Sequence, residues 1–510
     1  MKNSVLCYLE RSSNKYKNKE AIIDERGSIT FGEIREYAVK VANAIIEKSI
    51  GIQKPVLVFL PKGKESIATF MGIVYSRNFY VPTDVKYPKE RIEMLLNVLK
   101  PELIITDLKS KEKLTYYGIS DKNILLIENI ENQVCKYTGE ELCKKSMLSD
   151  LVYIIFTSGS TGIPKGVTIS NLNILEYIDW ATDTLGNDKN TIMGSLAPLY
   201  FDLSTHEIYT CLSKASTLVM IPEKFIPFPS ATLKYIKEKH VNSLYWVPSA
   251  YANIAILDLL KSIQLDEVQT MIFGGEVMPV KFLNYWRKYL PNLKLIVNMY
   301  GPTEATVNCT YYIVDREFSE NQQLPLGKSC DIKEVILLDE KDRKINPNEV
   351  DTIGEMCVCG TSLSKGYWNN KEATEKSFVQ NPLNSSCQET MYRTGDLASY
   401  NERGELEFIG RKDFQIKHMG YRIELGEIEA TILMTNIVEN ACVIYDKKER
   451  HIILVYCSQE ELAETYLQCE LSKVLPRYMI PSKYIYIKNM PITGSGKIDR
   501  KGLSDLYIKK

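Results

Sequence analysis

The alternation of short β-branched runs with helical stretches, from residue 151 to about residue 320, restricts the fold of this chain most. The runs are YIIF, STLVMI, SLYWV, TMIF and KLIVNM. β-Branched and aromatic residues favour strands, and strands that alternate with helices are typical of βαβ units. The pattern therefore predicts a layered α/β domain in which most strands are parallel.

The character of the sequence changes after this region. Residues 325–412 contain the glycine-bounded strands VILLD, GEMCVCG and GELEFIG, which predict an antiparallel β subdomain. A chain of 510 residues is too long for one hydrophobic core. We expect a large N-terminal domain, 1–412, of layered α/β subdomains plus this β subdomain. A small, mobile α+β domain is expected at 413–510.

Charge and hydropathy exclude several classes of protein. The 63 basic and 64 acidic residues give a net charge of -1, which does not favour nucleic-acid binding. The N-terminus lacks the apolar core of a signal peptide, and the longest apolar runs, such as 151–156, are too short to cross a bilayer. Twelve scattered cysteines fit reduced thiols. We expect a cytoplasmic protein without membrane insertion.

A loop rich in glycine and hydroxyl side chains follows the apolar run 151–156. Its sequence is TSGSTGIPKG, residues 157–166. The glycines allow the backbone to approach a ligand closely, and the hydroxyls and Lys165 supply donors and charge for phosphate oxygens. The spacing is not that of a Walker loop. Taken alone, the segment is either a phosphate-binding loop or a flexible Gly/Ser loop.

The chain resembles the adenylate-forming superfamily, which includes acyl-CoA synthetases, luciferases and the adenylation domains of peptide synthetases. The resemblance rests on the loop at 157–166 and on further segments in the family's order, spread over nearly the whole chain. These segments are YVPTDVKYPKERI, FDLSTHEIY, NMYGPTEATV, LSKGYW, YRTGD, GRKDFQIKHMGYRIELGEIE, LPRYMIPSKY and GSGKIDR. A single motif would be weak support, but the ordered set is specific.

The resemblance implies a reaction in two steps with ATP and Mg²⁺ as cofactors. A carboxylate attacks the α-phosphate of ATP and releases pyrophosphate, and a thiol then attacks the acyl-adenylate. The implied ATP-binding residues are Thr157, Ser158, Gly159, Thr161, Lys165, Tyr300, Thr303, Asp396 and Arg411. Glu304 is the implied Mg²⁺ ligand, since this ion prefers hard oxygen ligands, and Thr303 and Glu304 are assigned to catalysis.

Three residues near the C-terminus receive roles from the same resemblance. Lys497, in GSGKIDR, is expected to bridge the carboxylate and the α-phosphate and to stabilise the charge that moves between them. Asp413 lies at the expected hinge between the two domains. Gly420 belongs to the face expected to serve thiol transfer after the small domain swings.

Asp202 in FDLS indicates the class of acid that is activated. Family members that activate α-amino acids carry an aspartate here, which pairs with the substrate ammonium. An unpaired buried ammonium would be costly, so such a carboxylate discriminates against acids that lack the amine. The implied substrate is therefore an amino acid.

The remaining pocket positions, aligned by motif, indicate a small and largely apolar site. They are Leu203, His206, Trp246, Ile272, Gly274, Met299, Val307 and Asn308. The resemblance extends to D-alanine–carrier protein ligases and to prolyl-adenylating enzymes. The combination of Trp246 and Gly274 favours L-proline, because a secondary-amine ring needs flat apolar walls. D-Alanine is the alternative, although those ligases typically have cysteine at the position of Gly274.

The thiol acceptor is expected to be a separate molecule. Only ten residues follow GKIDR, and they contain no carrier-like serine motif. We expect a discrete carrier protein that bears phosphopantetheine, with coenzyme A as the alternative. Two other functions stay open, an acyl- or aryl-CoA ligase and a catalytically inactive homologue that serves as a binding subunit.

Overall fold

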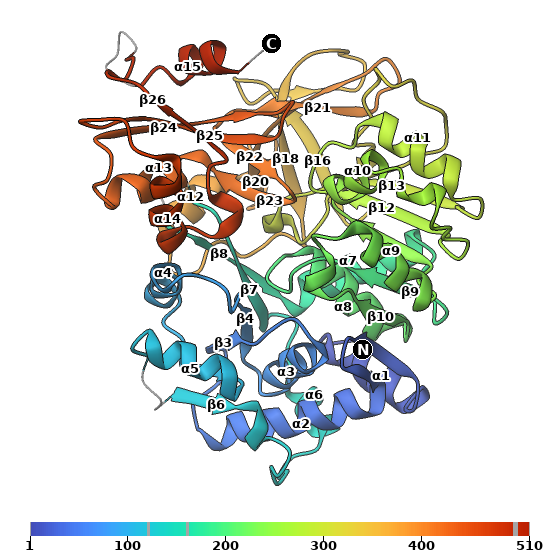
Figure 1. Ribbon diagram of the computed structural model, residues 1–510. Coiled ribbons are helices and arrows are strands. Elements are labelled where there is room, and N and C mark those ends of the chain that lie inside the picture. The colour runs from blue at the N-terminus through green and yellow to red at the C-terminus, as the bar shows by residue number, and fades with distance from the viewer. Residues whose placement is uncertain (1, 120–122, 160–162, 493–497, 509–510) are drawn as a thin grey trace. The chain divides into compact units, whose positions relative to one another are not determined.

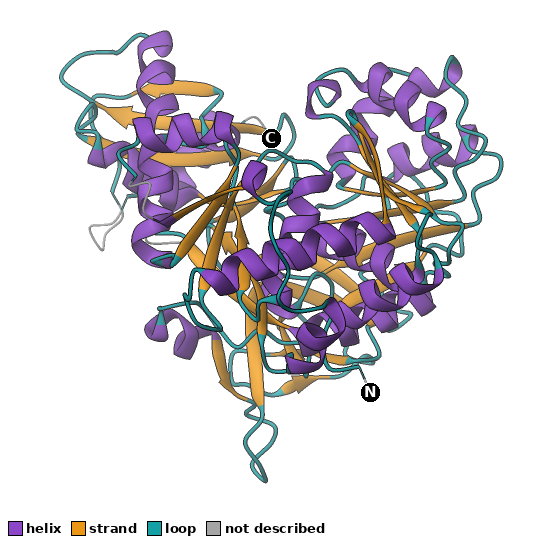
Figure 2. Ribbon diagram, turned by 90° about the horizontal axis from the view of Figure 1, so that it is seen from below, coloured by secondary structure: helices purple, strands orange, loops and turns teal. Residues whose placement is uncertain are grey.

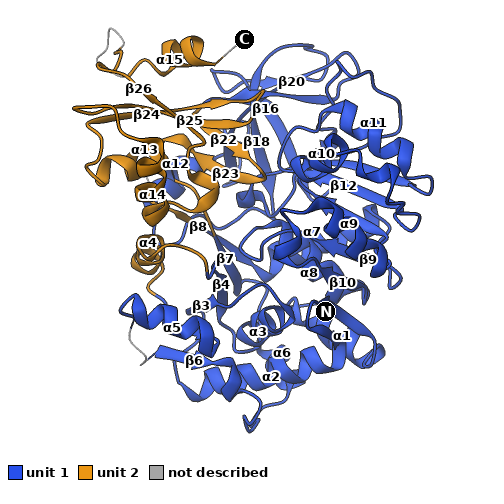
Figure 3. Cartoon of the chain, viewed as in Figure 1, with its two compact units in different colours: residues 1–85, 101–155, 166–412 blue, residues 86–100, 156–165, 413–510 orange. Residues whose placement is uncertain are grey.

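The computed structural model describes residues 2–119, 123–159, 163–492 and 498–508. The chain divides into two compact units, shown in Figure 3. The large unit comprises Met1–Val85, Pro101–Ile155 and Gly166–Lys412, and the small unit comprises Lys86–Lys100, Phe156–Lys165 and Asp413–Lys510. Two short segments that the predicted division placed within 1–412 thus group with the small unit. The division at residue 412 stays a prediction.

A nine-stranded sheet in the large unit carries much of the candidate site. Its order is β15-β14-β13-β12-β11-β9-β10-β1-β2. The strands are β1 (Glu20–Asp24), β2 (Gly27–Thr30), β9 (Ile192–Ser195), β10 (Thr217–Met220), β11 (Ser243–Trp246), β12 (Thr270–Gly274), β13 (Leu295–Tyr300), β14 (Thr310–Ile313) and β15 (Lys328–Ser329). The central strands, from β13 to β1, pair in parallel, while β2, β14 and β15 are antiparallel. The predicted α/β class is confirmed.

A second sheet has the order β6-β5-β3-β4-β7-β8. Its strands are β3 (Pro55–Phe59), β4 (Phe79–Pro82), β5 (Leu103–Thr106), β6 (Ile124–Leu126), β7 (Leu151–Thr157) and β8 (Lys165–Ser170). The pairs formed by β3, β4, β5, β6 and β7 are parallel. This sheet matters for function because β7 and β8 flank the glycine-rich loop.

Helices accompany the strands of both sheets (Figures 1 and 2). In the large unit they are α1 (Leu6–Lys15), α2 (Phe31–Glu47), α3 (Lys64–Tyr75), α5 (Leu108–Tyr116), α6 (Gly139–Lys145), α7 (Asn171–Thr184), α8 (Leu203–Lys214), α9 (Pro229–Glu238), α10 (Pro248–Ile256) and α11 (Val280–Tyr289). The 3₁₀ turns there are η2 (Ile127–Asn129), η3 (Glu223–Phe225), η4 (Leu259–Lys261) and η5 (Thr303–Ala305).

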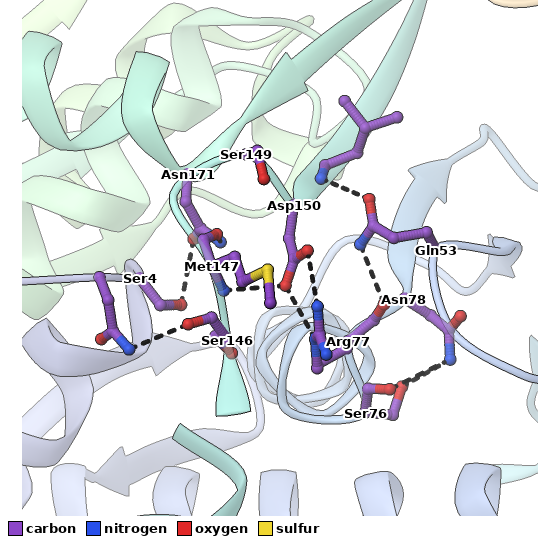
Figure 4. Close-up of polar contacts among 12 residues, drawn as sticks. Ser4, Gln53, Ser76, Arg77, Asn78, Ser146, Met147, Ser149, Asp150 and Asn171 are labelled. Carbon is purple, nitrogen blue, oxygen red and sulfur yellow. Dashed lines mark hydrogen bonds and ion pairs between the residues drawn. The ribbon is translucent and has the colours of Figure 1, made fainter. Parts of the chain in front are cut away.

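Polar contacts fix the point at which β7 begins (Figure 4). Arg77 forms two hydrogen bonds with Asp150, of 2.9 and 3.0 Å, and Asp150 also accepts one from the backbone N–H of Met147. The backbone N–H of Leu151 donates to Gln53, whose amide in turn donates to the carbonyl of Arg77. Because paired, part-buried charges resist displacement, this cluster anchors the strand that leads into the glycine-rich loop.

The third sheet of the large unit confirms the predicted antiparallel β subdomain. Its order is β17-β16-β18-β20-β19, and β21 pairs with β20. The elements are β16 (Lys333–Leu338), β17 (Lys344–Ile345), β18 (Gly354–Gly360), α12 (Lys371–Ser377), β19 (Phe378–Gln380), β20 (Thr390–Tyr400) and β21 (Leu406–Arg411). Each of these pairs is antiparallel.

The small unit combines short sheets with helices, as expected for an α+β domain. The strands β22 (Gln415–His418) and β23 (Tyr421–Glu424) form a hairpin, and β24 (Asn440–Asp446), β25 (His451–Cys457) and β26 (Lys483–Tyr486) form a sheet. The helices are α4 (Lys89–Leu99), α13 (Leu425–Met434), α14 (Glu464–Val474), α15 (Arg500–Tyr507) and the 3₁₀ turn η6 (Arg477–Met479). No helix in the described ranges of either unit has the length and apolar character needed to cross a membrane.

Candidate active site

The described part of the glycine-rich loop starts where β7 ends. Thr157 donates a hydrogen bond of 3.4 Å to the carbonyl of Lys165, which closes the base of the loop. A Cβ atom at Gly159 would lie 2.1 Å from the carbonyl oxygen of Ile163, so only glycine fits this backbone. Ser158 is buried, and its hydroxyl donates to the carbonyl of Arg422. Thr161 lies outside the described residues.

A buried carboxylate binds the backbone of this loop. Glu427 on α13 accepts a hydrogen bond of 3.2 Å from the N–H of Gly159 and forms an ion pair of 2.5 Å with Arg91 on α4. Burial raises the pKa of Glu427, and the charge of Arg91 opposes that shift. An N–H group that binds a carboxylate is also suited to a phosphate oxygen, because both ligands are anionic acceptors.

Asp202 and Thr303 come together in the large unit. Asp202 lies just before α8, and Thr303 begins η5 directly after the YGP segment that follows β13. The Thr303 hydroxyl donates a hydrogen bond of 2.7 Å to Oδ2 of Asp202. The residue predicted to bind the substrate amine is therefore in contact with a residue predicted to lie by the phosphates.

Glu304, the next residue, has a fully buried side chain. The Tyr367 hydroxyl donates to its carboxylate at 2.7 Å, and the N–H of Ser364 donates to its backbone carbonyl at 2.8 Å. A carboxylate oxygen is the ligand type that Mg²⁺ prefers, and this ion is commonly held by one or two carboxylates together with nucleotide phosphates. The donor chemistry of Glu304 fits that pattern. In the described ranges, no three His, Cys, Asp or Glu side chains form a separate metal cluster.

Asp396 joins two other predicted nucleotide-binding residues. It lies on β20 opposite Arg411 of β21, and the guanidinium donates to its carboxylate at 2.7 Å. The hydroxyl of Tyr300, at the end of β13, donates to the other carboxylate oxygen. All three belong to the large unit, so the structure assembles the residues predicted to bind the nucleoside. Their roles stay predictions.

Most residues predicted to contact the amino acid lie on one side of the nine-stranded sheet. Ile272, Met299 and Val307 share one buried apolar cluster, and Leu203 packs against it. His206 and Asn308 are buried nearby and are linked through Tyr177, whose hydroxyl lies 2.7 Å from Asn308 Oδ1 and 3.2 Å from His206 Nδ1. Burial lowers the pKa of His206 to about 4, so the imidazole is neutral at pH 7.

Trp246 lies apart from the other predicted pocket residues. Side chains alternate across a strand, so Tyr245 and Trp246 on β11 point to opposite faces. Trp246 packs against Trp286 and Tyr251 in a different apolar cluster, and its indole N–H donates to the carbonyl of Gly194. Tyr245 instead donates to Asn308 Oδ1 at 2.8 Å. Tyr245, and not Trp246, thus lies on the face that carries Ile272 and Met299, and the role of Trp246 in the pocket stays a prediction.

Gly274 lies at the end of β12 beside Met299 on β13. A Cβ atom at this position would lie 2.6 Å from the carbonyl oxygen of Met299, a backbone atom that cannot move without shifting the strand. Any larger residue, including the cysteine typical of D-alanine–carrier protein ligases, would require such a shift. The close approach of β12 and β13 accounts for glycine here.

The residues predicted to serve the small domain are described in part. Asp413 accepts a hydrogen bond of 3.2 Å from the N–H of Gln415, which starts the β22–β23 hairpin. Met419 and Gly420 form its two-residue turn, with φ values of 52° and 83°. Positive φ at both positions is typical of a type I′ turn, in which glycine is favoured. Lys497 lies outside the described residues, so its predicted role is not tested.

Comparisons with known proteins identify the family. The profile of the AMP-binding enzyme family matches residues 9–368. The chain belongs to the AMP-binding enzyme family. Enzymes of this family use ATP, and the resemblance inferred from the ordered motifs is confirmed.

Two curated relatives differ in how much of their length this chain covers. The D-alanine–D-alanyl carrier protein ligase of Bacillus licheniformis is 33% identical over 500 residues, which cover 95% of this chain and 96% of that protein. Tyrocidine synthase 3 of Brevibacillus parabrevis is 31% identical over 95% of this chain, but the chain spans only 7% of that synthase. This chain thus matches that ligase over nearly its full length and the synthase over a small part of its length.

Solved structures show the same fold. The Vibrio cholerae adenylation domain AlmE, in complex with glycyl-adenosine-5'-phosphate, matches with a TM-score of 0.85 at 19% identity, over 99% of this chain and 98% of that one. PA1221, a protein with adenylation and PCP domains, matches with a TM-score of 0.82 at 23% identity, over 99% of this chain and 97% of that one. The fold of an adenylation domain with its C-terminal subdomain is confirmed.

Several residues that contact the predicted site residues were not predicted, and of these only Tyr367 belongs to one of the motifs, LSKGYW. They are Tyr177 on α7, Tyr245 on β11, Tyr367 after β18 and Lys333 on β16. The strand alternation in SLYWV would have identified Tyr245, because Ile272 and Met299 fix which face of the neighbouring strands carries the site. No sequence signal separates Tyr177 from an ordinary core tyrosine.

Proposed function

We propose that this chain is an AMP-forming ligase that activates a small α-amino acid with ATP and transfers it to the phosphopantetheine thiol of a separate carrier protein. The observation that carries the proposal is the contact between Asp202 and Thr303, at 2.7 Å. It joins the carboxylate suited to a substrate ammonium to the segment that also holds Glu304, the candidate Mg²⁺ ligand. The family match and the full-length ligase relative support the enzyme class.

The proposed reaction has two half-reactions. In the first, a carboxylate oxygen of the amino acid forms a bond to the α-phosphorus of ATP, and the bond to the β-phosphate oxygen breaks to release pyrophosphate. In the second, the carrier thiolate attacks the carbonyl carbon, and AMP leaves with the electrons of the broken C–O bond. The substrate carboxylate is ionised at neutral pH and needs no general base, which fits the neutral His206 as a lining residue.

The residues divide between the two parts of the nucleotide. The loop residues Thr157, Ser158, Gly159, Thr161 and Lys165 are proposed to bind the phosphates, and Asp396 with Arg411 and Tyr300 to orient the nucleoside. Mg²⁺, held by Glu304, would neutralise charge on the phosphate oxygens. Lys497 is proposed to stabilise the transition state of the first half-reaction, and the hairpin with Gly420 to serve the second.

D-Alanine is the first candidate substrate. The full-length relative is a D-alanine–D-alanyl carrier protein ligase. The case for L-proline depended on Trp246 as a flat wall, and Trp246 packs in the opposite cluster. The rings of His206 and Tyr245, whose centres lie 5.0 Å apart, favour a substrate amino acid with a small side chain. Gly274 departs from the cysteine typical of D-alanine ligases, so glycine and other small amino acids belong in the same test.

Two other functions are less well supported. An acyl- or aryl-CoA ligase has no substrate ammonium for Asp202 to bind. A catalytically inactive homologue is under no constraint to keep Glu304, Asp396 and Arg411 together, yet the last two form an ion pair of 2.7 Å. Two observations would distinguish these alternatives from the proposed function: which thiol accepts the acyl group, and whether the reaction requires an amino acid.

Carrier loading tests the proposal. The chain is incubated with ATP, Mg²⁺, D-alanine and a phosphopantetheinylated carrier protein, and the carrier is weighed by intact-protein mass spectrometry. The expected result is a gain of one alanyl residue on the phosphopantetheine form and none on the unmodified carrier. Coenzyme A replaces the carrier in a parallel reaction. The proposal would be contradicted if coenzyme A were loaded and the carrier protein were not. It would also be contradicted if aryl acids were loaded and no amino acid was.

A further inference from the structure

Lys333, the first residue of β16, is a buried cation beside the predicted amino-acid site. The residue is 6% exposed, and Glu176 is the carboxylate whose charge acts on its ammonium. Burial lowers the pKa of its ammonium. Burying an ammonium is costly unless its donors are hydrogen-bonded, so the groups that Lys333 binds decide whether the burial is tolerated.

The ammonium of Lys333 binds the backbone on both sides of Val307. Its Nζ donates to the carbonyl of Thr306 at 3.2 Å and to the carbonyl of Asn308. Nζ also lies 5.3 Å from the centre of the Tyr177 ring, within the range of a cation–π contact. The ammonium thus contacts two carbonyls of one backbone turn and one aromatic ring.

That turn is strained. Thr306 and Val307 have φ values of 57° and 64°, in the left-handed region that β-branched residues rarely adopt. Such a conformation persists only when surrounding contacts hold it, and strain of this kind is common at functional sites. Lys333 supplies two of those contacts, because the two carbonyls that it binds flank the strained Val307.

The strained turn presents residues that are assigned to the amino-acid site. Val307 and Asn308 are predicted pocket residues, and Glu304 precedes them by one turn of η5. Asn308 accepts the hydroxyls of Tyr177 and Tyr245 at 2.7 and 2.8 Å. Lys333 therefore contacts Asn308 directly, through the backbone carbonyl of Asn308, and indirectly, through the ring of Tyr177. Lys333 does not belong to any of the motifs.

We propose that Lys333 is a positioning residue for the amino-acid site, whose ammonium holds the Thr306–Asn308 turn and thereby places Val307 and Asn308 against the substrate side chain. This inference rests on the proposed function. It assigns no chemical step to Lys333, which contacts protein groups only. Its loss is expected to impair recognition of the amino acid and to leave the nucleotide site unchanged.

The test uses the full chain with Lys333→Met, which keeps the length of the side chain and removes its charge and donors. Amino-acid-dependent ATP–pyrophosphate exchange is measured while the amino acid and ATP are varied in turn. The KM for the amino acid is expected to rise at least about tenfold, the size expected when hydrogen bonds from a charged group are lost. The KM for ATP is expected to stay within about twofold of wild type.

The matched control is Lys344→Met on the adjacent strand β17. Lys344 is half-exposed and pairs with Glu334 at 3.1 Å, so its loss is expected to leave both KM values unchanged. Equal increases of the two KM values in Lys333→Met, or an unchanged KM for the amino acid, would overturn the proposal. If Lys333→Met does not fold, Lys333→Gln, which keeps an N–H donor without the charge, is measured against the same criteria.

A double-mutant cycle separates positioning from a general loss of stability. Asn308→Ala and Lys333→Met are measured singly and together, with Tm recorded for each. If Lys333 acts through Asn308, the two effects on the amino-acid KM are less than additive. Additive effects would overturn the positioning role. A wild-type chain without exchange for any amino acid would instead refute the proposed function itself.

Discussion

The hydroxyl of Thr303 donates a 2.7 Å hydrogen bond to the carboxylate of Asp202, although the two residues are 101 positions apart in the sequence. One residue begins the turn that holds Glu304, and the other precedes α8. The bond fixes an oxygen of the residue predicted to bind the amine relative to the turn predicted to bind phosphate. We propose that this pair couples substrate recognition to adenylation chemistry.

Asp202→Asn is predicted to abolish recognition of the amino acid. The amide keeps the shape of the side chain and can still accept from Thr303, but it cannot neutralise an ammonium. The kcat/KM for the amino acid is expected to fall by at least about a hundredfold, since removing one member of a buried charge pair costs about 3 kcal/mol or more. Exchange kinetics measure this change. A fall of less than threefold would show that Asp202 has a structural role only.

Tyr245 and Trp246 are predicted to give opposite results, because they face different sides of β11. Tyr245→Phe removes a hydroxyl that binds Asn308 and is expected to raise the KM for the amino acid several-fold with little change in Tm. Trp246→Phe removes an indole bonded to Gly194 and packed on Trp286, and is expected to destabilise the large unit by about 1–3 kcal/mol. Thermal unfolding and exchange kinetics on both variants decide the matter. The reverse outcome would restore Trp246 to the pocket.

His206 is predicted to make the free energy of unfolding depend on pH in the acidic range. Burial lowers its pKa from 6.5 to about 4, and the hydroxyls of Tyr177 and Tyr245 are the titratable groups beside its ring. The unfolded state therefore binds more protons than the folded state between those values, so stability falls as the pH drops through this window. The loss between pH 7 and pH 5 is about 2 kcal/mol.

Urea unfolding at these two pH values measures this effect. His206→Gln removes the titrating ring and is expected to lose less stability than wild type over the same interval. Its absolute stability is not diagnostic, because the substitution also disturbs packing. An equal loss in both proteins would show that other groups govern the acid response.

Lys497→Ala is predicted to separate the two half-reactions. Without the lysine, the charge that develops between the carboxylate and the α-phosphate is less stabilised, so adenylation is expected to fall by about two to three orders of magnitude. Transfer from chemically prepared aminoacyl-adenylate to the carrier is expected to survive largely intact. Single-turnover measurements of each step compare the two. Equal losses in both steps would contradict the assignment of Lys497 to adenylation alone.

Much of the architecture could be predicted from local pattern. The runs STLVMI, SLYWV, TMIF and KLIVNM form parallel strands of the nine-stranded sheet, and YIIF forms β7 of the second sheet. The glycine-bounded strands of 325–412 form the antiparallel sheet. Both predictions depend on periodicity and on turn residues, which are properties of short segments. The grouping of 86–100 and 156–165 with the C-terminal segment depends on tertiary contacts such as that between Arg91 and Glu427. Sequence spacing carries no such information.

The site was predictable only where motifs supplied it. Ordered motifs located Asp202, Thr303, Glu304, Asp396 and Arg411, and the structure brings these into two connected groups. Trp246 was predicted to line the pocket, yet its side chain packs on the other face of the sheet, because a shift of one residue along a strand reverses the face. Lys333 was missed because a lysine near a strand start is ordinarily solvated, and only the fold shows that its ammonium meets the carbonyl of Thr306.

Amino-acid-dependent ATP–pyrophosphate exchange tests the central claim most directly. The wild-type chain is assayed with D-alanine, glycine, the proteinogenic amino acids including L-proline, and several aryl and fatty acids, beside the Asp202→Asn variant. The account predicts exchange with one or a few small amino acids, D-alanine first, and its loss in Asp202→Asn. Exchange with an aryl or fatty acid alone, undiminished in Asp202→Asn, would contradict it.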